Sequence, residues 1–279
     1  MESVNSMSIK NALCIDVDDL IASVQEAEIL GASRYPYHVE KETEYLLEKL
    51  ASLGLKATFF IPGFVTNNYS KTVRLISENG HEVASHGTKH TWVRKQSKND
   101  FLEDVKKSKA DLENITGSSV DTFKAPIWGI DKETLWALDT LVEAGFRCDH
   151  SLMPHLFREL GKDPKLPAKI SNGLLLIPPT HFHTMGRSIP MFGGFYNAYW
   201  PQFLQKSVYK KMNNKNLPFN FYFHPFEFKS QFSWFERFKI SFRVGVYSAH
   251  AGVYEKYLPR LMKHFEFSTL KESYKEYWN

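Results

Sequence analysis

Short apolar segments alternate with amphipathic helical segments along most of this 279-residue chain. Residues 12–17 form the first apolar segment. Residues 39–53 follow, with apolar side chains on one helical face and Gly54 placed to end the helix. Residues 56–61 then have the pattern of a buried strand and are closed by a Pro-Gly turn. Strand–helix alternation of this kind implies right-handed βαβ crossovers, so we expect a parallel sheet or barrel.

The alternation continues through the rest of the chain. Further helices are predicted over residues 70–79, 99–116, 131–144 and 251–264. Further strands are predicted over residues 81–85, 120–124, 146–148, 174–177, 219–223 and 265–269. Residues 154–201 are poorly periodic, and we interpret them as an elaboration of the same unit. Because no internal repeat or low-complexity linker divides the sequence, we predict a single α/β domain.

The composition is that of a globular protein, with 43% hydrophobic and 24% charged residues. The 35 Lys plus Arg against 31 Asp plus Glu give a charge of +4, a mild excess that does not indicate nucleic acid binding. Cys14 and Cys148 are too few for a disulfide scaffold. Residues 1–11 lack a signal-peptide core, and no apolar run approaches the roughly 20 residues of a membrane span. We therefore expect a cytoplasmic protein.

Carboxylates, imidazoles and one lysine follow the ends of five predicted strands. They are Asp16, Asp18, Asp19, His86, His90, Lys124, Asp149 and His224. In parallel α/β folds, functional side chains gather where strands end and loops begin. We therefore expect these side chains to converge on one site.

His86 and His90 are the first candidates for metal ligands. They are four residues apart, so one helical turn would direct both imidazoles the same way. Two imidazoles with one carboxylate form a common divalent-metal set that leaves positions open for water. The alternative is a pair of surface histidines without a ligand.

The acidic triplet offers the carboxylate. Asp16, Asp18 and Asp19 repel one another, and a bound cation would relieve that repulsion. Asp16 and Asp18 share a face of an extended segment, whereas Asp19 points away if the strand persists. We assign Asp18 to the metal and Asp16 to proton transfer, and we keep Asp19 as the alternative ligand. Capping of the following turn is the competing structural interpretation.

Lys124 and His224 each have two interpretations. Lys124 could be a solvated surface charge, or it could lie near Asp16 and Asp149 and help to keep both carboxylates ionised. His224 lies in an apolar, aromatic segment, FYFHPFEF, where a hydrogen-bonded core histidine is the alternative to a functional one.

Five ordered motifs resemble those of a known family. IDVDD, SHGTKH, FKAPIWG, CDHS and YFHPFE are similar to the successive motifs of the polysaccharide deacetylases, the NodB-homology domain of carbohydrate esterase family four. Within that family the chain looks most like the signal-less branch found with exopolysaccharide gene clusters. The resemblance implies a distorted (β/α)7-type barrel. Residues 12–228 would form the catalytic domain, and residues 229–279 a C-terminal extension packed on the same barrel.

The resemblance also implies a reaction and a set of roles. It implies a metal-dependent hydrolase that holds one divalent metal, usually Zn²⁺, and removes N-acetyl groups from amino sugars of a polysaccharide or its lipid-linked precursor. The implied roles are general base for Asp16, metal ligand for Asp18, His86 and His90, general acid for His224, and a carboxylate, Asp149, that pairs with the basic residue of the third motif, Lys124.

The residues after Lys124 are expected to face the substrate. A backbone N–H near Ile127, after Pro126, would hold the developing oxyanion. Trp128 would form a wall for the sugar ring, with a core position as the alternative. The family usually has Arg at position 124, and a lysine cannot offer the same bidentate contact. Val17 is an inserted-looking residue in the first motif, and it leaves the choice between Asp18 and Asp19 open.

Two other functions remain open. One is a deformylase or deacylase of a lipid-linked sugar, and the other is a non-catalytic sugar-binding barrel. Residues 232–247 mix aromatic and basic side chains and could rest on an anionic membrane surface. The alternative is a loop that packs its aromatic side chains on the barrel.

Overall fold

The computed structural model describes residues 9–20, 37–184, 187–194, 197, 200–240 and 248–278. The strands are β1 (Lys10–Asp16), β2 (Thr58–Ile61), β3 (Glu82–Ser85), β4 (Thr122–Phe123), β5 (Cys148–Asp149), β6 (Ala168–Lys169), β7 (Leu175–Leu176), β8 (His181–Thr184), β9 (Arg187–Pro190), β10 (Asn220–Phe223) and β11 (Glu266–Ser268). The helices are α2 (Val39–Ser52), α3 (Gly63–Asn68), α4 (Ser70–Glu78), α5 (Lys98–Thr116), α6 (Ala137–Glu143), α7 (Pro154–Glu159), α9 (Gln202–Asn213), α10 (Pro225–Phe228), α11 (Trp234–Ile240), α13 (Val253–Met262) and α14 (Leu270–Ser273).

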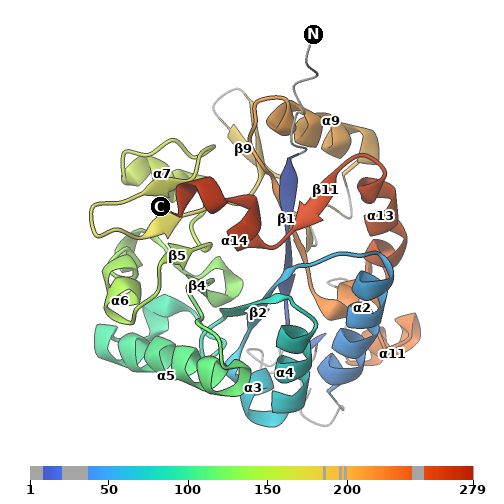
Figure 1. Ribbon diagram of the computed structural model, residues 1–279, viewed down its shortest axis with the longest axis horizontal. Helices are drawn as coiled ribbons and strands as arrows, with labels where there is room; N and C mark the ends of the chain where they lie inside the picture. The colour runs from blue at the N-terminus through green and yellow to red at the C-terminus, as the bar shows by residue number, and fades with distance from the viewer. Residues whose placement is uncertain are drawn as a thin grey trace.

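The main sheet has the strand order β10-β1-β2-β3-β4-β5-β7-β6, and β11 also pairs with β1. All neighbouring pairs from β10 to β7 are parallel, and only the β6–β7 pair is antiparallel. The sheet curls into a half-barrel, with α2, α4, α5 and α6 around its outside (Figure 1). The expected distorted (β/α)7-type barrel in a single domain is confirmed.

Side chains from the two faces of β1 enter different apolar clusters. Leu13 and Ile15 pack in the large cluster that contains Leu46 and Leu50 of α2. Ala12 and Cys14 point to the other face, where they join a smaller cluster. Strands buried on both faces read as continuous apolar runs, which is why this strand lacks polar alternation. After Asn11, the next polar residue of this strand is Asp16, at the carboxyl edge of the sheet.

The C-terminal segment joins the same core. Strand β11 pairs with the first residues of β1, and the N–H of Leu270 in α14 donates to Thr58 Oγ1 in β2 at 2.7 Å. Tyr254 and Leu258 of α13 belong to the same apolar cluster as the strands. A boundary between residues 228 and 229 stays a prediction.

The predicted strands and most predicted helices are confirmed, with ends that move by up to two residues. Residues 131–144 instead form a short 3-10 turn at 132–134 and then α6, because the Asp131 carboxylate caps that turn. Residues 154–201 contain α7 and the β8–β9 hairpin, whose half-buried side chains hide any alternation. Among the described residues, no helix is both long and apolar enough to cross a membrane.

Candidate functional site

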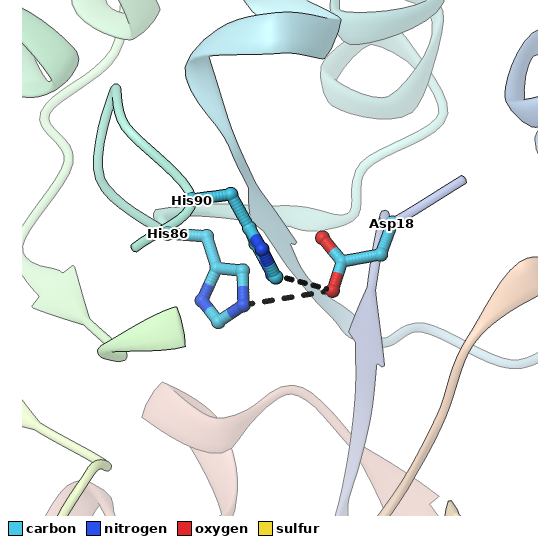
Figure 2. Close-up of side chains that lie close together, drawn as sticks. All are labelled: Asp18, His86 and His90. Atoms are coloured by element: carbon cyan, nitrogen blue, oxygen red, sulfur yellow. Dashed lines mark hydrogen bonds and ion pairs between the residues drawn. The ribbon is translucent and has the colours of Figure 1, made fainter. Parts of the chain in front are cut away.

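Asp18, His86 and His90 converge just beyond the carboxyl ends of β1 and β3 (Figure 2). Asp18 Oδ2 lies 3.0 Å from His90 Nε2 and 3.9 Å from His86 Nε2. The three candidate ligand atoms all lie within 4.8 Å of one another. Asp18 and His86 are buried, and His90 is partly exposed. This arrangement brings together the two imidazoles and the carboxylate that suit a divalent metal.

His86 is held in the form that binds a metal. Its Nδ1 lies 2.7 Å from the backbone carbonyl of Lys124, which can only accept, so Nδ1 carries the proton. Nε2 is then left with its lone pair on the side of Asp18. Burial lowers the pKa of His86 to about 4, although Asp18 opposes that shift, so the ring is neutral at pH 7. These residues therefore fit a divalent ion.

The charge state of Asp18 also suits a cation. Burial by itself would raise the pKa of its carboxyl group, but the neighbouring His90, His86 and His224 lower it, and the net shift is downward. Asp18 is therefore an anion at neutral pH. An anionic oxygen ligand beside imidazole nitrogens is the donor set of many zinc sites.

The two histidines lie on an irregular loop and not on a helical turn, which corrects the expectation from their spacing. Gly87 has φ +74, and a Cβ there would meet Asp104 Oδ2 at 3.1 Å. The N–H groups of Thr88 and Lys89 donate to the Asp104 carboxylate at 3.0 and 2.9 Å. Helix α5 thus anchors the loop that carries both imidazoles.

Asp18, His86 and His90 together form the candidate metal site, called here the ligand cluster. Asp19 lies outside it. Its Oδ2 accepts hydrogen bonds from the N–H groups of His38 and Val39, at 2.6 and 2.9 Å, where α2 begins. A carboxylate there interacts favourably with the positive end of the helix dipole. The geometry therefore favours Asp18 over Asp19 as the ligand. The inserted-looking Val17, which lies between Asp16 and Asp18 in the sequence, is buried.

Asp16 and Lys124 form a buried ion pair beside this cluster. Lys124 Nζ contacts Asp16 Oδ2, and it lies 4.2 Å from the ring centroids of both Trp128 and Tyr222. The other carboxylate oxygen, Asp16 Oδ1, is buried and accepts no hydrogen bond from the described residues. A buried oxygen that accepts no hydrogen bond costs folding free energy, so such an oxygen calls for an explanation. Acceptance of a proton or of a hydrogen bond from a bound water would provide one.

Asp149 does not pair with Lys124, and that expectation is wrong. The only ion pair of Lys124 with a described residue is the one to Asp16. Asp149 instead accepts from the Ser151 N–H at 3.0 Å and from Ser151 Oγ at 2.5 Å, and burial raises its pKa to about 7. Ser151 Oγ in turn accepts from the N–H of Ala125 at 2.7 Å. A lysine has one terminal nitrogen, so it lacks the second arm with which an arginine could bridge two carboxylates.

His224 faces the cluster from β10. Its Nε2 lies 3.8 Å from Asp18 Oδ2, and its Nδ1 lies 2.9 Å from Glu227 Oε2. Burial lowers the pKa of His224, but Glu227 raises it more, to about 9. Burial raises the pKa of Glu227, but His224 lowers it more, to about 2. The pair is therefore a buried imidazolium and carboxylate at neutral pH.

Sequence analysis missed two residues of this site, Glu227 and His250. Glu227 Oε1 contacts His250 Nε2, and both side chains are buried. The signal for Glu227 is the motif His-Pro-Phe-Glu, because a residue three positions after a helix cap can bond back to it. His250 has no local signal, since it reaches the site from the C-terminal segment.

The turn after Lys124 has an unusual backbone. Pro126 is buried, whereas Ile127 and Trp128 have φ of 58° and 55°, in the left-handed region that a β-branched residue such as Ile rarely adopts. Strain of this kind persists at functional sites because the surroundings impose it. The half-buried Trp128 ring contacts the rings of His150, Phe192 and Tyr222, with centroids 5.6, 5.0 and 5.8 Å away.

Two family models match the chain. Residues 34–147 match the model described as polysaccharide deacetylase, and residues 149–275 match a domain of unknown function, DUF3473. The candidate ligands His86 and His90 lie in the first region, and Asp18 precedes it. His224, Glu227 and His250 lie in the second region. The candidate site therefore draws side chains from both parts.

Curated relatives and a solved structure are similar to the chain. A peptidoglycan deacetylase of Helicobacter pylori is 32% identical over 116 residues, which cover 40% of this chain and 37% of the relative. Chitin deacetylase 1 of Saccharomyces cerevisiae is 29% identical over 140 residues, covering 46% and 44%. The chain thus matches less than half the length of these relatives. A structure described as a candidate polysaccharide deacetylase from Mycobacterium smegmatis superimposes with a TM-score of 0.57 at 16% identity, covering 97% and 96%, and it shares the fold.

Proposed function

This chain belongs to the polysaccharide deacetylase family, and on that premise we propose that it is a metal-dependent hydrolase of amino-sugar N-acetyl groups. The substrate would be a polysaccharide or its lipid-linked precursor. One observation carries the proposal: the ligand cluster of Asp18, His86 and His90 lies beside a buried carboxylate with an unpartnered oxygen, Asp16, and a buried imidazole, His224.

The ligand cluster would hold one divalent ion, and its donor set favours Zn²⁺. When bound, the ion would polarise the amide carbonyl and lower the pKa of a neighbouring water. The His86 tautomer and the ionised Asp18 are already in the forms that such an ion requires.

The chain's own residues would move the protons. Asp16 would accept a proton from the attacking water at Oδ1, while Lys124 holds the other oxygen. The hydroxyl of that water adds to the acyl carbon, and the C–N bond breaks. His224 gives its Nε2 proton to the departing nitrogen, so the products are acetate and a free amine. A backbone N–H near Ile127 would stabilise the developing oxyanion, and Trp128 would contact the sugar ring.

We also propose a cytoplasmic protein that contacts the inner face of a membrane. Both cysteines are buried and unbridged, which is consistent with a reducing compartment. Helix α11 exposes Trp234 and Phe235, with 52% and 72% of their surfaces accessible. By contrast, Phe232 is buried as in the alternative interpretation. The basic residue Arg243 in this stretch lies outside the described residues.

The proposal is tested by metal content and acyl release together. We expect about one divalent ion per chain in the wild type and in His224→Ala, and none in His86→Ala. The wild type should release acetate from an N-acetylglucosamine oligomer, and both variants should lose this activity. His155→Ala removes an exposed histidine and serves as the matched control, with wild-type metal and activity.

Three results would change the proposal. A wild type without metal, even after reconstitution with zinc, would overturn the hydrolase and favour a sugar-binding barrel. Release of formate from an N-formyl sugar without release of acetate would replace the deacetylase with a deformylase. Full activity in His86→Ala would overturn the ligand assignment.

A further inference from the structure

Glu227 lies between two imidazoles in the interior. Glu227 Oε2 lies 2.9 Å from His224 Nδ1, and it also accepts the backbone N–H of His224 at 2.7 Å. Its second oxygen, Oε1, contacts His250 Nε2. Glu227 is fully buried, and the two histidines are nearly so. A buried carboxylate is expensive unless its oxygens are bonded, and here both oxygens are.

This arrangement fixes the orientation of the His224 ring. Nδ1 is occupied by Glu227, so Nε2 is the ring nitrogen directed at the ligand cluster, 3.8 Å from Asp18 Oδ2. Helix α10 begins directly after His224 and returns the Glu227 side chain to it. Because Glu227 can only accept, it also keeps the proton of Nδ1 in place after Nε2 has given up its own.

The C-terminal segment holds the other side of Glu227. The N–H of Gly252 donates to the Glu227 carbonyl at 2.8 Å. The guanidinium of Arg237, itself buried, donates to the carbonyl of Ser248 at 2.6 Å and anchors the turn that carries His250. These two contacts hold the turn that carries His250 next to Glu227.

We propose that Glu227 and His250 are positioning residues that orient His224 as the proton donor. The region that matches a domain of unknown function would then complete the active site, because it supplies the donor and both residues that orient it. This inference rests on the proposed function.

The test compares two substrates that differ in leaving group. An amide needs a proton on its departing nitrogen, whereas a 4-nitrophenyl acetate releases a stable anion without one. In Glu227→Met, Glu227→Gln and His250→Gln we expect kcat for the amide to fall by ~10²-fold or more, with KM near the wild-type value. Aryl acetate hydrolysis and metal content should stay near wild type. Glu227→Gln keeps one acceptor and should lose less than Glu227→Met.

The controls are a buried carboxylate and a buried histidine at the opposite end of the sheet. Glu82 accepts hydrogen bonds from the hydroxyls of Thr58 and Thr122, and His81 Nδ1 accepts from the N–H of Ala57. Glu82→Gln and His81→Gln should cost stability but leave the ratio of amide to ester activity unchanged. A purely structural role for Glu227 would give the same unchanged ratio.

A spectroscopic measurement on the metal-free protein is independent of activity. At a pH high enough to make the imidazole neutral, long-range ¹H–¹⁵N spectra should show the His224 proton on Nδ1 in the wild type, and a mixture of tautomers in Glu227→Met. A wild type that hydrolyses neither substrate would remove the proposed function. An active wild type whose Glu227 variants keep the amide-to-ester ratio and the His224 tautomer would overturn the positioning role alone.

Discussion

Asp104 acts on the ligand cluster without contributing a ligand. It lies on α5, and its two carboxylate oxygens accept the N–H groups of Thr88 and Lys89 within the loop between His86 and His90. The hydroxyl of Thr88 also donates to the Asp104 carbonyl at 3.0 Å. Groups that orient metal ligands in this way raise the affinity for the metal, because the ligand side chains then lose less conformational freedom when the metal binds.

We expect Asp104→Asn to weaken metal binding by about 10- to 100-fold. The asparagine NH₂ would replace one acceptor and face a backbone N–H, so one of the two loop hydrogen bonds would be lost. Competition with a chelator of known affinity measures the change. Asp111→Asn, on the same helix and paired only with Lys107 among the described residues, should bind metal as the wild type does. Equal affinity in both variants would contradict the anchoring role of Asp104.

At the scale of elements, α2 connects the ligand region to the C-terminal segment. The Asp19 carboxylate accepts the N–H groups at the beginning of α2. In the first turn of α2, Glu42 accepts the N–H of Gln231 at 2.8 Å. Glu42 is buried, and its Oε2 has no hydrogen-bond partner among the described residues. Burial raises the pKa of Glu42 to about 8 against the opposing hydrogen bond from Gln231.

This raised pKa predicts a pH-dependent penalty on folding. Glu42 is protonated in the folded state up to about pH 8, whereas in the unfolded chain its carboxyl group has the ordinary glutamate pKa of 4.5. The unfolded state therefore binds fewer protons between these values, and the group's contribution to stability falls as pH rises, by at most about 1.4 kcal/mol per pH unit. Below pH 4.5 that contribution is fully present.

Glu42→Gln should remove that dependence. The oxygen of the introduced glutamine can keep the hydrogen bond from Gln231, and its NH₂ replaces the oxygen that has no partner. Because this side chain does not titrate, we expect the free energy of unfolding of the variant to rise relative to that of the wild type as pH rises from about 5 to about 8. Urea unfolding at both pH values measures the difference. Glu44→Gln, on the exposed face of α2, is the control and should show no such trend. A Glu42→Gln advantage that is equal at both pH values would contradict the raised pKa.

At the scale of the whole molecule, the chain closes on itself where its C-terminal segment meets the sheet. Strand β11 pairs with β1, and α14 lies beside them (Figure 1). The polar network around Glu227 ties the same C-terminal segment to the candidate site at the carboxyl edge of the sheet. We therefore expect the segment after residue 228 to be needed both for folding and for the orientation of His224.

The exposed side chains of Trp234 and Phe235 on α11 concern how the whole molecule contacts a membrane surface. We expect the wild-type protein to float with vesicles of anionic phospholipid at low salt. The double variant Trp234→Ser/Phe235→Ser should lose most of the vesicle-bound fraction. Raising the salt should also weaken binding. Phe203→Ser removes an equally exposed aromatic side chain on α9 and should leave binding unchanged. Absence of flotation in the wild type would rule out this contact.

The order of strands and helices could be predicted from the sequence because its causes are local. Apolar periodicity defines the buried face of each helix, and a glycine such as Gly117, with φ of 66°, ends α5 where the pattern stops. Parallel topology then brings the ends of β1 and β3 together, which made the convergence of Asp18, His86 and His90 predictable.

The partner of each buried charge depends on how the chain folds, and the sequence pattern does not reveal it. Asp19 bonds the beginning of α2, 20 residues away, and Asp149 bonds Ser151 instead of Lys124. His250 reaches Glu227 across 23 residues of chain. Such pairings depend on side-chain reach and on how distant segments pack, and a buried charge takes whichever partner that packing offers. Sequence alone therefore predicted the convergence of Asp18, His86 and His90, whereas the contacts of Glu227 with His224 and His250 emerged only from the folded chain.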